Sequence, residues 1–276
     1  MSESKEGSDR RTAESNARDR RTVILLRLCA PMMSFGGPVV DSVGRTYRIP
    51  KLSMITGLIG NALGIDKSEF GRLEALQRQV EYGIRVDSEG EVVRDFQIAD
   101  LGQEKMMSAN AWTTKGRTQP RTGSVKEEKV IQRKKYLADA QYTVAVYLRQ
   151  ERSTARSGAT GEKPEDGGAE ERGTEEGGEE HNGFTTEEVE EALQYPARTL
   201  YIGRKTCIPS APIYGGSIQA KSVESALAVD GSYDGWVPMS PEDFEDPSVE
   251  MLRMDGRKDW RNNTHTGAQH LKRVRL

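Results

Sequence analysis

The residues best suited to bind a ligand lie in a basic segment between Gly102 and Tyr136. The segment holds nine Lys or Arg against three Glu, contains Trp112 and shows no sustained hydrophobic period. Its cations can neutralise phosphates, and the rings of Trp112 and Tyr136 can stack on bases for about 1–3 kcal/mol per base. Composition alone fits a solvated, flexible hairpin equally well. The segment is therefore a candidate arm for binding a polyanion such as nucleic acid.

A second basic cluster comes just before a predicted helix. Its residues are Arg45, Tyr47, Arg48 and Lys51. The N-terminal amides of a helix favour a phosphate, and these cations would add to that attraction. The alternative is a loop whose Tyr47 packs on the core. The residue types leave both interpretations open.

A third cluster follows a predicted strand over residues 200–202, which breaks into Gly203, Arg204 and Lys205. A glycine at the end of a strand lets backbone amides approach a phosphate while the two cations neutralise it. The same three residue types are common on protein surfaces, so this motif needs support from its surroundings.

The sequence contains few residues suited to catalysis. Its three histidines, His181, His265 and His270, fall in segments that we interpret as disordered or terminal, which leaves the core without an imidazole for acid–base chemistry. Metal-ligand spacings, a Walker-type loop and a Gly-x-Ser-x-Gly elbow are absent. Pairs of Asp and Glu are more typical of solvated faces. We predict no catalytic residue, no metal and no cofactor.

Regular elements must position these clusters. Thr22–Ala30 is a compact apolar run that predicts a central strand, and Ser53–Leu63 places its apolar residues on one helical face. Ser53 is the predicted N-cap of this helix and Gly64 its C-terminal stop. Two glycines inside the helix would permit a neighbouring backbone to approach closely.

The next elements lead into the basic arm. A short helix is predicted over Glu69–Leu76. Strands follow over Tyr82–Val86 and Glu91–Ile98, on either side of a hairpin turn at residues 87–90 that ends in glycine. The arm leaves from the second of these strands.

After the arm, strands are predicted over Val130–Leu137 and Tyr142–Leu148, and a capped helix over Thr185–Leu193 ends before Pro196. The order strand, helix, strand pair, helix, strand is that of a ferredoxin-like βαββαβ unit. The predicted fold class is therefore α+β, with the arm projecting from the middle hairpin. Residues 205–276 are typical of short strands and loops that end in a basic tail.

Two segments are too polar to form a core. Residues 1–21 contain six basic and five acidic side chains, and residues 151–180 contain ten acidic side chains, four basic ones and seven glycines. We predict a disordered tail over 1–21 and a disordered acidic insertion over about 151–183. Without residues 151–180, basic and acidic counts of 40 and 43 become 36 and 33, so the net charge changes from −3 to +3. The remaining chain is mildly basic.

Signals for secretion and membrane insertion are missing from the sequence. It has no apolar h-region followed by a cleavage site, and no run of about 18 apolar residues that could span a bilayer. We therefore expect a cytoplasmic protein without a membrane partner.

Five ordered stretches resemble a single protein family. They are LLRLCAPMMSFGGP, GRTYRIPKLSMITGLIGNALGI, RVDSEGEVVRDFQIADLG, VIQRKKYLADAQYTVAVYL and RTLYIGRKTCIPSAPIYGG. Together they cover most of residues 22–216, and they closely resemble the CasD family. This is the fifth Cas family, a group of RAMP proteins in the type I-E CRISPR surveillance complex Cascade. The tail and the acidic block fall outside the family pattern, and the last sixty residues match it only loosely.

The resemblance implies a RAMP domain of ferredoxin-like (RRM-like) fold over residues 22–204, with a long thumb β-hairpin, and a small C-terminal β-rich region over 205–276. It also implies a non-catalytic RNA-binding subunit that caps the 5′ handle of crRNA in antiviral defence. The implied partners are the crRNA, the adjacent backbone subunit of Cascade and its large subunit. Target DNA would be met only through the assembled complex.

Carried over by position, the thumb spans about residues 99–130. The RNA-binding residues implied on the thumb and its returning strand are Trp112, Lys115, Arg117, Arg121, Gln132, Arg133, Lys134 and Tyr136. The glycine-rich loop is matched by Gly203, Arg204 and Lys205, and the stretch before the first helix by Arg45, Tyr47, Arg48 and Lys51.

One branch of the family implies an enzyme instead. In subtype I-C the subunit is itself a metal-independent endoribonuclease that cuts precursor crRNA with a Tyr, Lys and His set. In this sequence Tyr47 or Tyr136 and Lys115 are available for two of these roles, but Gly116 follows Lys115 and no histidine accompanies them. We favour the non-catalytic subunit. A general RNA-binding protein outside CRISPR is the third hypothesis.

Overall fold

The computed structural model describes residues 20–37, 39–40, 43–100, 110–112, 118–120, 129–150, 183–228, 231 and 233–275. The predicted acidic insertion up to residue 182, and the predicted tail up to residue 19, lie outside this part of the chain. Within it, no helix is long and apolar enough to cross a membrane.

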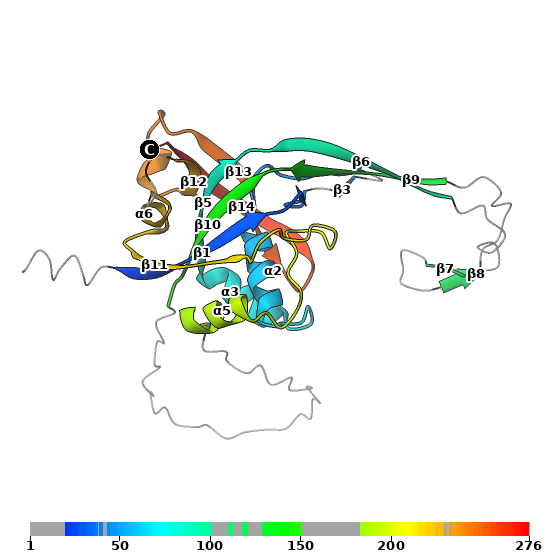
Figure 1. The fold of residues 1–276 in the computed structure, drawn as a ribbon, viewed down its shortest axis with the longest axis horizontal. Helices are drawn as coiled ribbons and strands as arrows, with labels where there is room; N and C mark the ends of the chain where they lie inside the picture. The colour runs from blue at the N-terminus through cyan, green and yellow to red at the C-terminus, as the bar shows by residue number, and fades with distance from the viewer. Residues whose placement is uncertain are drawn as a thin grey trace, which may run out of the picture.

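The fold is α+β and is centred on a seven-stranded antiparallel sheet (Figure 1). In sheet order the strands are β11 (Tyr214–Ala220), β1 (Arg21–Cys29), β10 (Gln141–Leu148), β5 (Val80–Ser88), β12 (Asp234–Pro238), β14 (Thr264–Arg275) and β13 (Met251–Asp259). The predicted first strand is confirmed as β1. It has a neighbour on each side but lies second from the edge of the sheet.

Helices cover both faces of this sheet. α2 (Leu52–Ala62), α3 (Phe70–Gln79) and α5 (Thr186–Gln194) pack on the face that carries the larger core cluster, which includes Ile24 and Leu26 of β1. The short α6 (Val223–Leu227) packs with Val23 on the opposite face. Alternate residues of β1 point to opposite faces, so its continuous apolar run is explained by burial on both sides.

The predicted first helix is confirmed as α2, but its N-cap is not Ser53. Lys51 occupies that position with an extended backbone and no side-chain cap, while Ser53 is buried in the first turn. The helix begins at Leu52 because that side chain is needed in the core. Gly64 follows the helix with a φ of +74°, as expected of its C-terminal stop. A Cβ at Gly60 would lie 2.7 Å from Leu73 of α3, so this glycine does permit close helix packing.

The basic arm begins as a two-stranded ribbon that runs away from the sheet and helices (Figure 1). β6 (Glu91–Asp100) pairs with β9 (Lys129–Ala138) in ten antiparallel residue pairs. At 3.3 Å per residue, this ribbon spans about 33 Å. Farther along the chain, β7 (Asn110–Trp112) pairs with β8 (Thr118–Pro120).

The predicted hairpin turn at residues 87–90 is wrong. β5 pairs with β10, and β6 pairs with β9, so the two strands on either side of the expected turn belong to different sheets. The chain crosses between the sheets at Gly90 and returns through Asp139, with φ values of +59° and +54°. A Cβ at Gly90 would overlap the carbonyl oxygen of Ala138. Gly90 is therefore required because two backbone segments cross closely at this point. The chain leaves the main sheet from β5 into β6 and returns from β9 into β10.

A smaller sheet is built around β9. Its order is β2-β9-β4-β3, with β6 also paired to β9. The short strands are β2 (Met32–Met33), β3 (Val39–Val40) and β4 (Val43–Gly44). β4 runs parallel to β9 and places Gly44 opposite Lys134, which brings residues 45–51 to the base of the arm.

Residues 205–276 extend the main sheet. β12 pairs with β5, and β13 and β14 form a hairpin whose second strand pairs with β12. A short 3-10 turn, η2 (Glu242–Phe244), precedes that hairpin. His265 and His270 both lie in β14. Our interpretation of these two histidines as part of a terminal or disordered segment is therefore wrong, because the strand that carries them is paired along its length.

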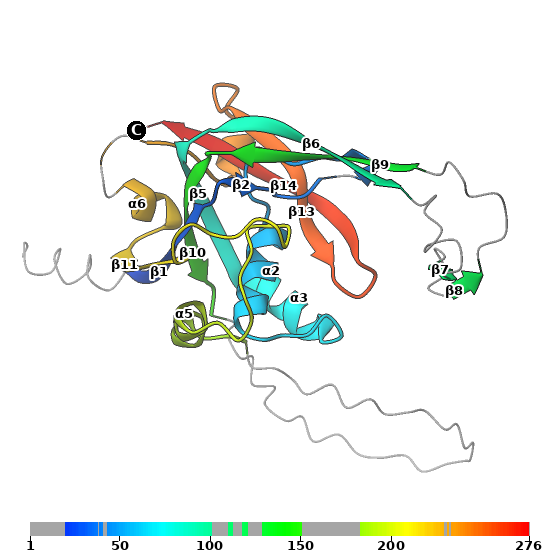
Figure 2. The same cartoon turned by 45° about the vertical axis from the view of Figure 1, so that its right-hand side comes forward.

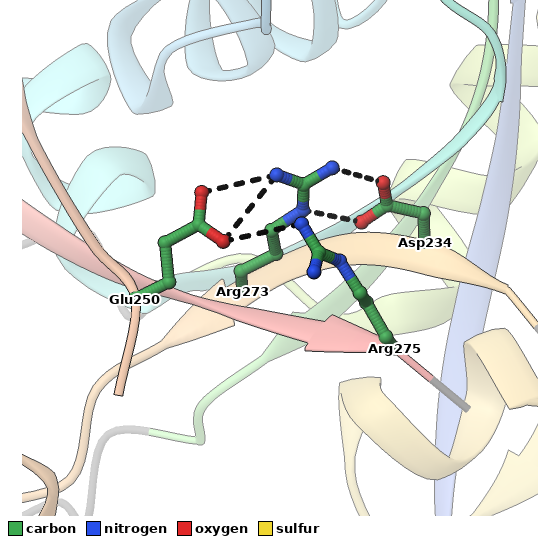
Figure 3. A network of polar contacts seen from close by, with 4 residues as sticks. All are labelled: Asp234, Glu250, Arg273 and Arg275. Atoms are coloured by element: carbon green, nitrogen blue, oxygen red, sulfur yellow. Dashed lines mark hydrogen bonds and ion pairs between the residues drawn. The ribbon is translucent and has the colours of Figure 1, made fainter. Parts of the chain in front are cut away.

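Ion pairs connect the last strand, β14, to β12 and to Glu250 (Figure 3). Arg273 of β14 forms an ion pair with Asp234 of β12 and a second one, at 3.0 Å, with Glu250. Arg275 joins Glu250 at 3.3 Å. The hydrogen bond from Arg273 lowers the pKa of Asp234, so this carboxylate stabilises the paired strands in its charged form.

Candidate nucleic-acid interface

One groove brings several of the predicted binding residues together. It has a volume of about 1100 Å³ and follows α2 between the loop over residues 198–205 and the β13–β14 hairpin. Figure 2 shows α2 between these two segments. The basic side chains that line the groove are Lys51, Lys67, Arg198, Arg204, Lys205 and Lys258, against a single carboxylate, Asp66. This excess of positive charge suits a polyanion.

Arg198 is occupied by contacts at the end of α2. Its guanidinium donates hydrogen bonds to the carbonyl oxygens of Ile65 and Gly64 at 2.9 and 3.0 Å, and it forms an ion pair with Asp66 at 3.0 Å. This residue therefore neutralises the one acidic side chain of the groove. The positive charge available to a ligand comes from the other cations.

Lys51 lines the groove and lies against the Tyr47 ring. Lys51 is 3% exposed, and its ammonium lies 4.9 Å from the centroid of the Tyr47 ring. The Tyr47 hydroxyl donates a hydrogen bond to Asp255 Oδ2 at 2.8 Å. Burial lowers the pKa of Lys51, although Asp255 opposes this shift. Burial and the bond to Asp255 raise the pKa of Tyr47, so the phenol keeps its proton at neutral pH.

The structure therefore combines the two interpretations of the second cluster. Tyr47 packs against the core, as the loop interpretation requires. Lys51 nevertheless lines the groove. Arg45 and Arg48 are exposed beside it, and their backbone carbonyls accept hydrogen bonds from Arg204 and from the Tyr142 hydroxyl.

Gly203 and Arg204 join the groove to the base of the arm. Gly203 has a φ of +94°, and a Cβ there would overlap the carbonyl oxygen of Ser34. Arg204 donates a 2.9 Å hydrogen bond to the Lys135 carbonyl of β9, and its guanidinium lies 4.6 Å from the centroid of the Tyr136 ring. Arg204 thus connects the loop to the arm, whereas Lys205 is exposed on the same loop.

Tyr136 has a different environment from the one predicted. Its side chain is 3% exposed, and Arg204 covers its ring. A base cannot stack on it without breaking these contacts. Its neighbour Leu137 is also buried, so this part of β9 belongs to the core, which explains why an aromatic residue occurs there.

Three predicted residues on β9 lie on the arm, outside the groove. Gln132 and Arg133 are exposed, and the Arg133 guanidinium lies 5.6 Å from the centroid of the Phe96 ring. Lys134 donates a 3.2 Å hydrogen bond to Gln97. Trp112 belongs to β7, and its side chain, like Lys115, Arg117 and Arg121, lies outside the described residues.

Sequence reasoning missed three residues that the C-terminal hairpin contributes to the groove: Lys258, Trp260 and His265. The Lys258 ammonium lies 4.4 Å from the centroid of the Trp260 ring, and that ring approaches the Cβ position of Gly57 to 3.4 Å. Lys258 stands opposite His265 in the β13–β14 register. The signal for this hairpin was the pair of asparagines at 262–263, a turn sequence whose second residue has a φ of +56°.

Charged residues near His265 change the pKa of its imidazole. Burial lowers the pKa of its imidazole, and the nearby cations Lys51 and Lys258 lower it further against the opposing effect of Asp255. The imidazole is therefore neutral at pH 7 and can accept or donate a hydrogen bond. Within the described part of the chain, no group of three or more His, Cys, Asp or Glu side chains could hold a metal ion.

Comparisons with known proteins give one consistent relationship. The model of the family described as CRISPR-associated protein (Cas_Cas5) matches residues 23–160 and 172–270. The CRISPR system Cascade subunit CasD of Escherichia coli (strain K12) is 26% identical over 207 residues, which cover 75% of this chain and 76% of that protein.

Two solved structures share the fold. A chain of a CRISPR RNA-guided surveillance complex aligns with a TM-score of 0.59 and 19% identity, over 92% of this chain and 90% of that one. A Cas protein solved by crystallography aligns with a TM-score of 0.51 and 17% identity, over 92% and 94% of the two chains.

Proposed function

This chain belongs to the CRISPR-associated Cas5 family, and from that premise we propose that it is a non-catalytic RNA-binding subunit of a type I-E Cascade complex. In this proposal it binds and caps the 5′ handle of crRNA in the cytoplasm and takes part in antiviral defence. The similarity to Cascade subunit CasD supports the assignment to that complex.

The groove along α2 is the observation that carries the RNA-binding role. Its cations come from three separate parts of the chain, and the partly exposed Tyr201 and Trp260 line it among them. Cations with interleaved aromatic rings are the combination that binds a single strand through phosphates and stacked bases. Arg204 connects the groove to the arm, so one strand of RNA can follow both surfaces.

The strand order supports a ferredoxin-like (RRM-like) RAMP domain, but its fourth strand is β11 (Tyr214–Ala220) and not the one predicted over residues 200–202, so the unit extends past the predicted boundary at residue 204. In β11-β1-β10-β5, the first strand of the βαββαβ unit lies between the fourth and the third, and the second is outermost, as that fold requires. α2 and α5 are its two helices. We assign the β6–β9 ribbon to the thumb, and the strands after β11, which are β12, β13 and β14, to the C-terminal β-rich region that continues the same sheet.

The arm also supports contact with a neighbouring subunit. Val92 and Phe96 on β6 are 44% and 51% exposed, which is unusual for large apolar side chains on a projecting strand. We infer that this surface meets the adjacent backbone subunit of Cascade. We propose the large subunit of Cascade as a further partner, and target DNA as one that is reached only through the assembled complex.

One observation favours a second candidate, a metal-independent endoribonuclease that processes precursor crRNA. Asp255 interacts with Tyr47, Lys51 and His265. His265 could therefore fill the histidine role for which the sequence analysis found no residue. A neutral His265 would take the proton of a ribose 2′-OH, whose oxygen would attack the adjacent phosphorus and release the 5′-oxygen of the next nucleotide, leaving a 2′,3′-cyclic phosphate. The protonated Tyr47 is already bonded to Asp255, so it is not poised as a base.

Incubation of the full chain with labelled repeat RNA in EDTA separates the two candidates. We expect the RNA to be bound and recovered intact at a molar excess of protein. Single-turnover cleavage that disappears in His265→Ala would overturn the non-catalytic assignment and establish the nuclease.

A further inference from the structure

Lys51 is a buried cation without an anionic ligand of its own. It is 3% exposed, and within the described residues its ammonium is engaged only by the Tyr47 ring and, at longer range, by Asp255. Oδ2 of that carboxylate already accepts a hydrogen bond from the Tyr47 hydroxyl at 2.8 Å. A buried ammonium is costly unless it is paired and hydrogen-bonded. The position therefore calls for an anion that the chain itself does not supply.

Ser34 provides a second unmatched group in the same groove. It is 1% exposed, and its Oγ has no hydrogen-bond partner within the described residues. The segment from Ser34 to Gly36 lies between the other candidate ligands: the Ser34 carbonyl abuts Gly203, and the Cβ position of Gly36 lies 4.0 Å from Lys51 Cε. Ser34 and Lys51 thus line the groove on either side of this short segment.

The N-terminus of α2 adds a third source of positive potential. The eleven-residue helix begins directly after Lys51, no side chain caps it, and its first turn holds no acidic residue. In this turn the Met54 amide donates to the Lys51 carbonyl oxygen at 3.0 Å, and the N-terminus as a whole carries the positive end of the helix dipole. Lys258 and His265 line the same groove, and both feel the charge of neighbouring cations.

We propose that Lys51, Ser34 and the first turn of α2 form a site for one phosphate group of the bound RNA strand. A phosphate carries negative charge and several acceptor oxygens, which suits a lysine, a hydroxyl and the positive end of a helix dipole. The proposal rests on the RNA-binding function above and adds to it a defined anchor point, distinct from the exposed cations that attract the strand without fixing its register.

Lys51→Met tests the anchor because methionine fills a similar space without the charge. We expect binding of repeat-derived RNA to weaken about tenfold to a hundredfold, the range for a hydrogen bond to a charged group. We also expect the RNA-free chain to unfold at the same temperature or higher, since an unmatched buried charge is removed. Arg27→Gln is the matched control, because Arg27 is exposed on the sheet face opposite α2 and should not change affinity.

Single methylphosphonate linkages along the RNA identify the phosphate directly, because each removes one backbone charge. At one linkage the substitution should weaken binding to the natural chain about tenfold but add nothing in Lys51→Met. If every linkage gives the same change in both proteins, Lys51 does not hold a phosphate and the proposal is overturned, while the RNA-binding function still stands.

Inorganic phosphate separates the sources of the ligand. We expect it to raise the unfolding temperature of the natural chain more than that of Lys51→Met. If this shift is seen but RNA does not bind, the site binds free phosphate and the proposed RNA-binding function is wrong. If neither the shift nor a linkage-specific effect is seen, the site is refuted.

Discussion

Gly203→Ala tests how the glycine-rich loop is held against the segment before α2. Two effects act at this position: the residue has a φ of +94°, and an added Cβ would overlap the Ser34 carbonyl oxygen. Placing alanine at such a φ costs about 1–3 kcal/mol. The overlap adds about 1–3 kcal/mol, as overpacking does elsewhere. We therefore expect Gly203→Ala to lower the free energy of unfolding by about 2–6 kcal/mol.

Gly216→Ala is the matched control for this substitution. Its φ of +106° is similar, but nothing lies within 4 Å of its Cβ position. It should lose only the part that belongs to the backbone conformation, about 1–3 kcal/mol. Urea unfolding of both variants measures the difference. Equal losses in the two variants would refute the close approach of Gly203 to Ser34, and with it our account of how the loop borders the groove.

Three other substitutions test separate parts of the structure. Arg204→Ala should lower the free energy of unfolding by about 1.5–3 kcal/mol, because the charged hydrogen bond to the Lys135 carbonyl is lost. Hydrogen exchange of the β9 amides should become faster, and unchanged exchange would contradict the connection between loop and arm. Because the pKa of Asp234 is lowered in the folded chain, its carboxylate stabilises the fold above the ordinary Asp pKa, and this stabilisation is lost as pH falls through the pKa of the folded state. In urea unfolding, Asp234→Asn should therefore be less stable than the natural chain at neutral pH and about equally stable in acid. Trp260→Phe removes a buried indole N–H that has no partner within the described residues and keeps an aromatic ring in the groove, so in urea unfolding the variant should be at least as stable as the natural chain. A loss of stability would contradict this account of the indole N–H.

The central elements could be predicted because their patterns are local. The apolar run of β1 and the helical face of α2 follow directly from burial, and both were found within a residue of their expected bounds. The turn at residues 87–90 was mispredicted because a glycine at the end of a polar tetrapeptide has the same signature in a hairpin turn and in a crossing between sheets. Only the backbone of Ala138, far away in the sequence, distinguishes the two.

The site was only partly predictable for the same reason. The glycine-rich loop and Lys51 could be identified as phosphate-binding candidates from their neighbours in the chain. Burial of Tyr136 beneath Arg204, however, depends on a contact between residues 68 positions apart, and composition cannot show it. Lys258, Trp260 and His265 reach the groove because the β13–β14 hairpin joins the main sheet through β12 and β5, and this long-range pairing has no local signature.

The affinity of the full chain for the repeat-derived 5′ handle, compared with a scrambled RNA of the same length and composition, tests the central claim most directly. Fluorescence anisotropy across a range of salt concentrations gives both affinities and their salt dependence. The account predicts tighter binding of the handle, with a preference that Lys51→Met reduces. Equal affinity for the two RNAs at every salt concentration would contradict it and leave only a general RNA-binding protein.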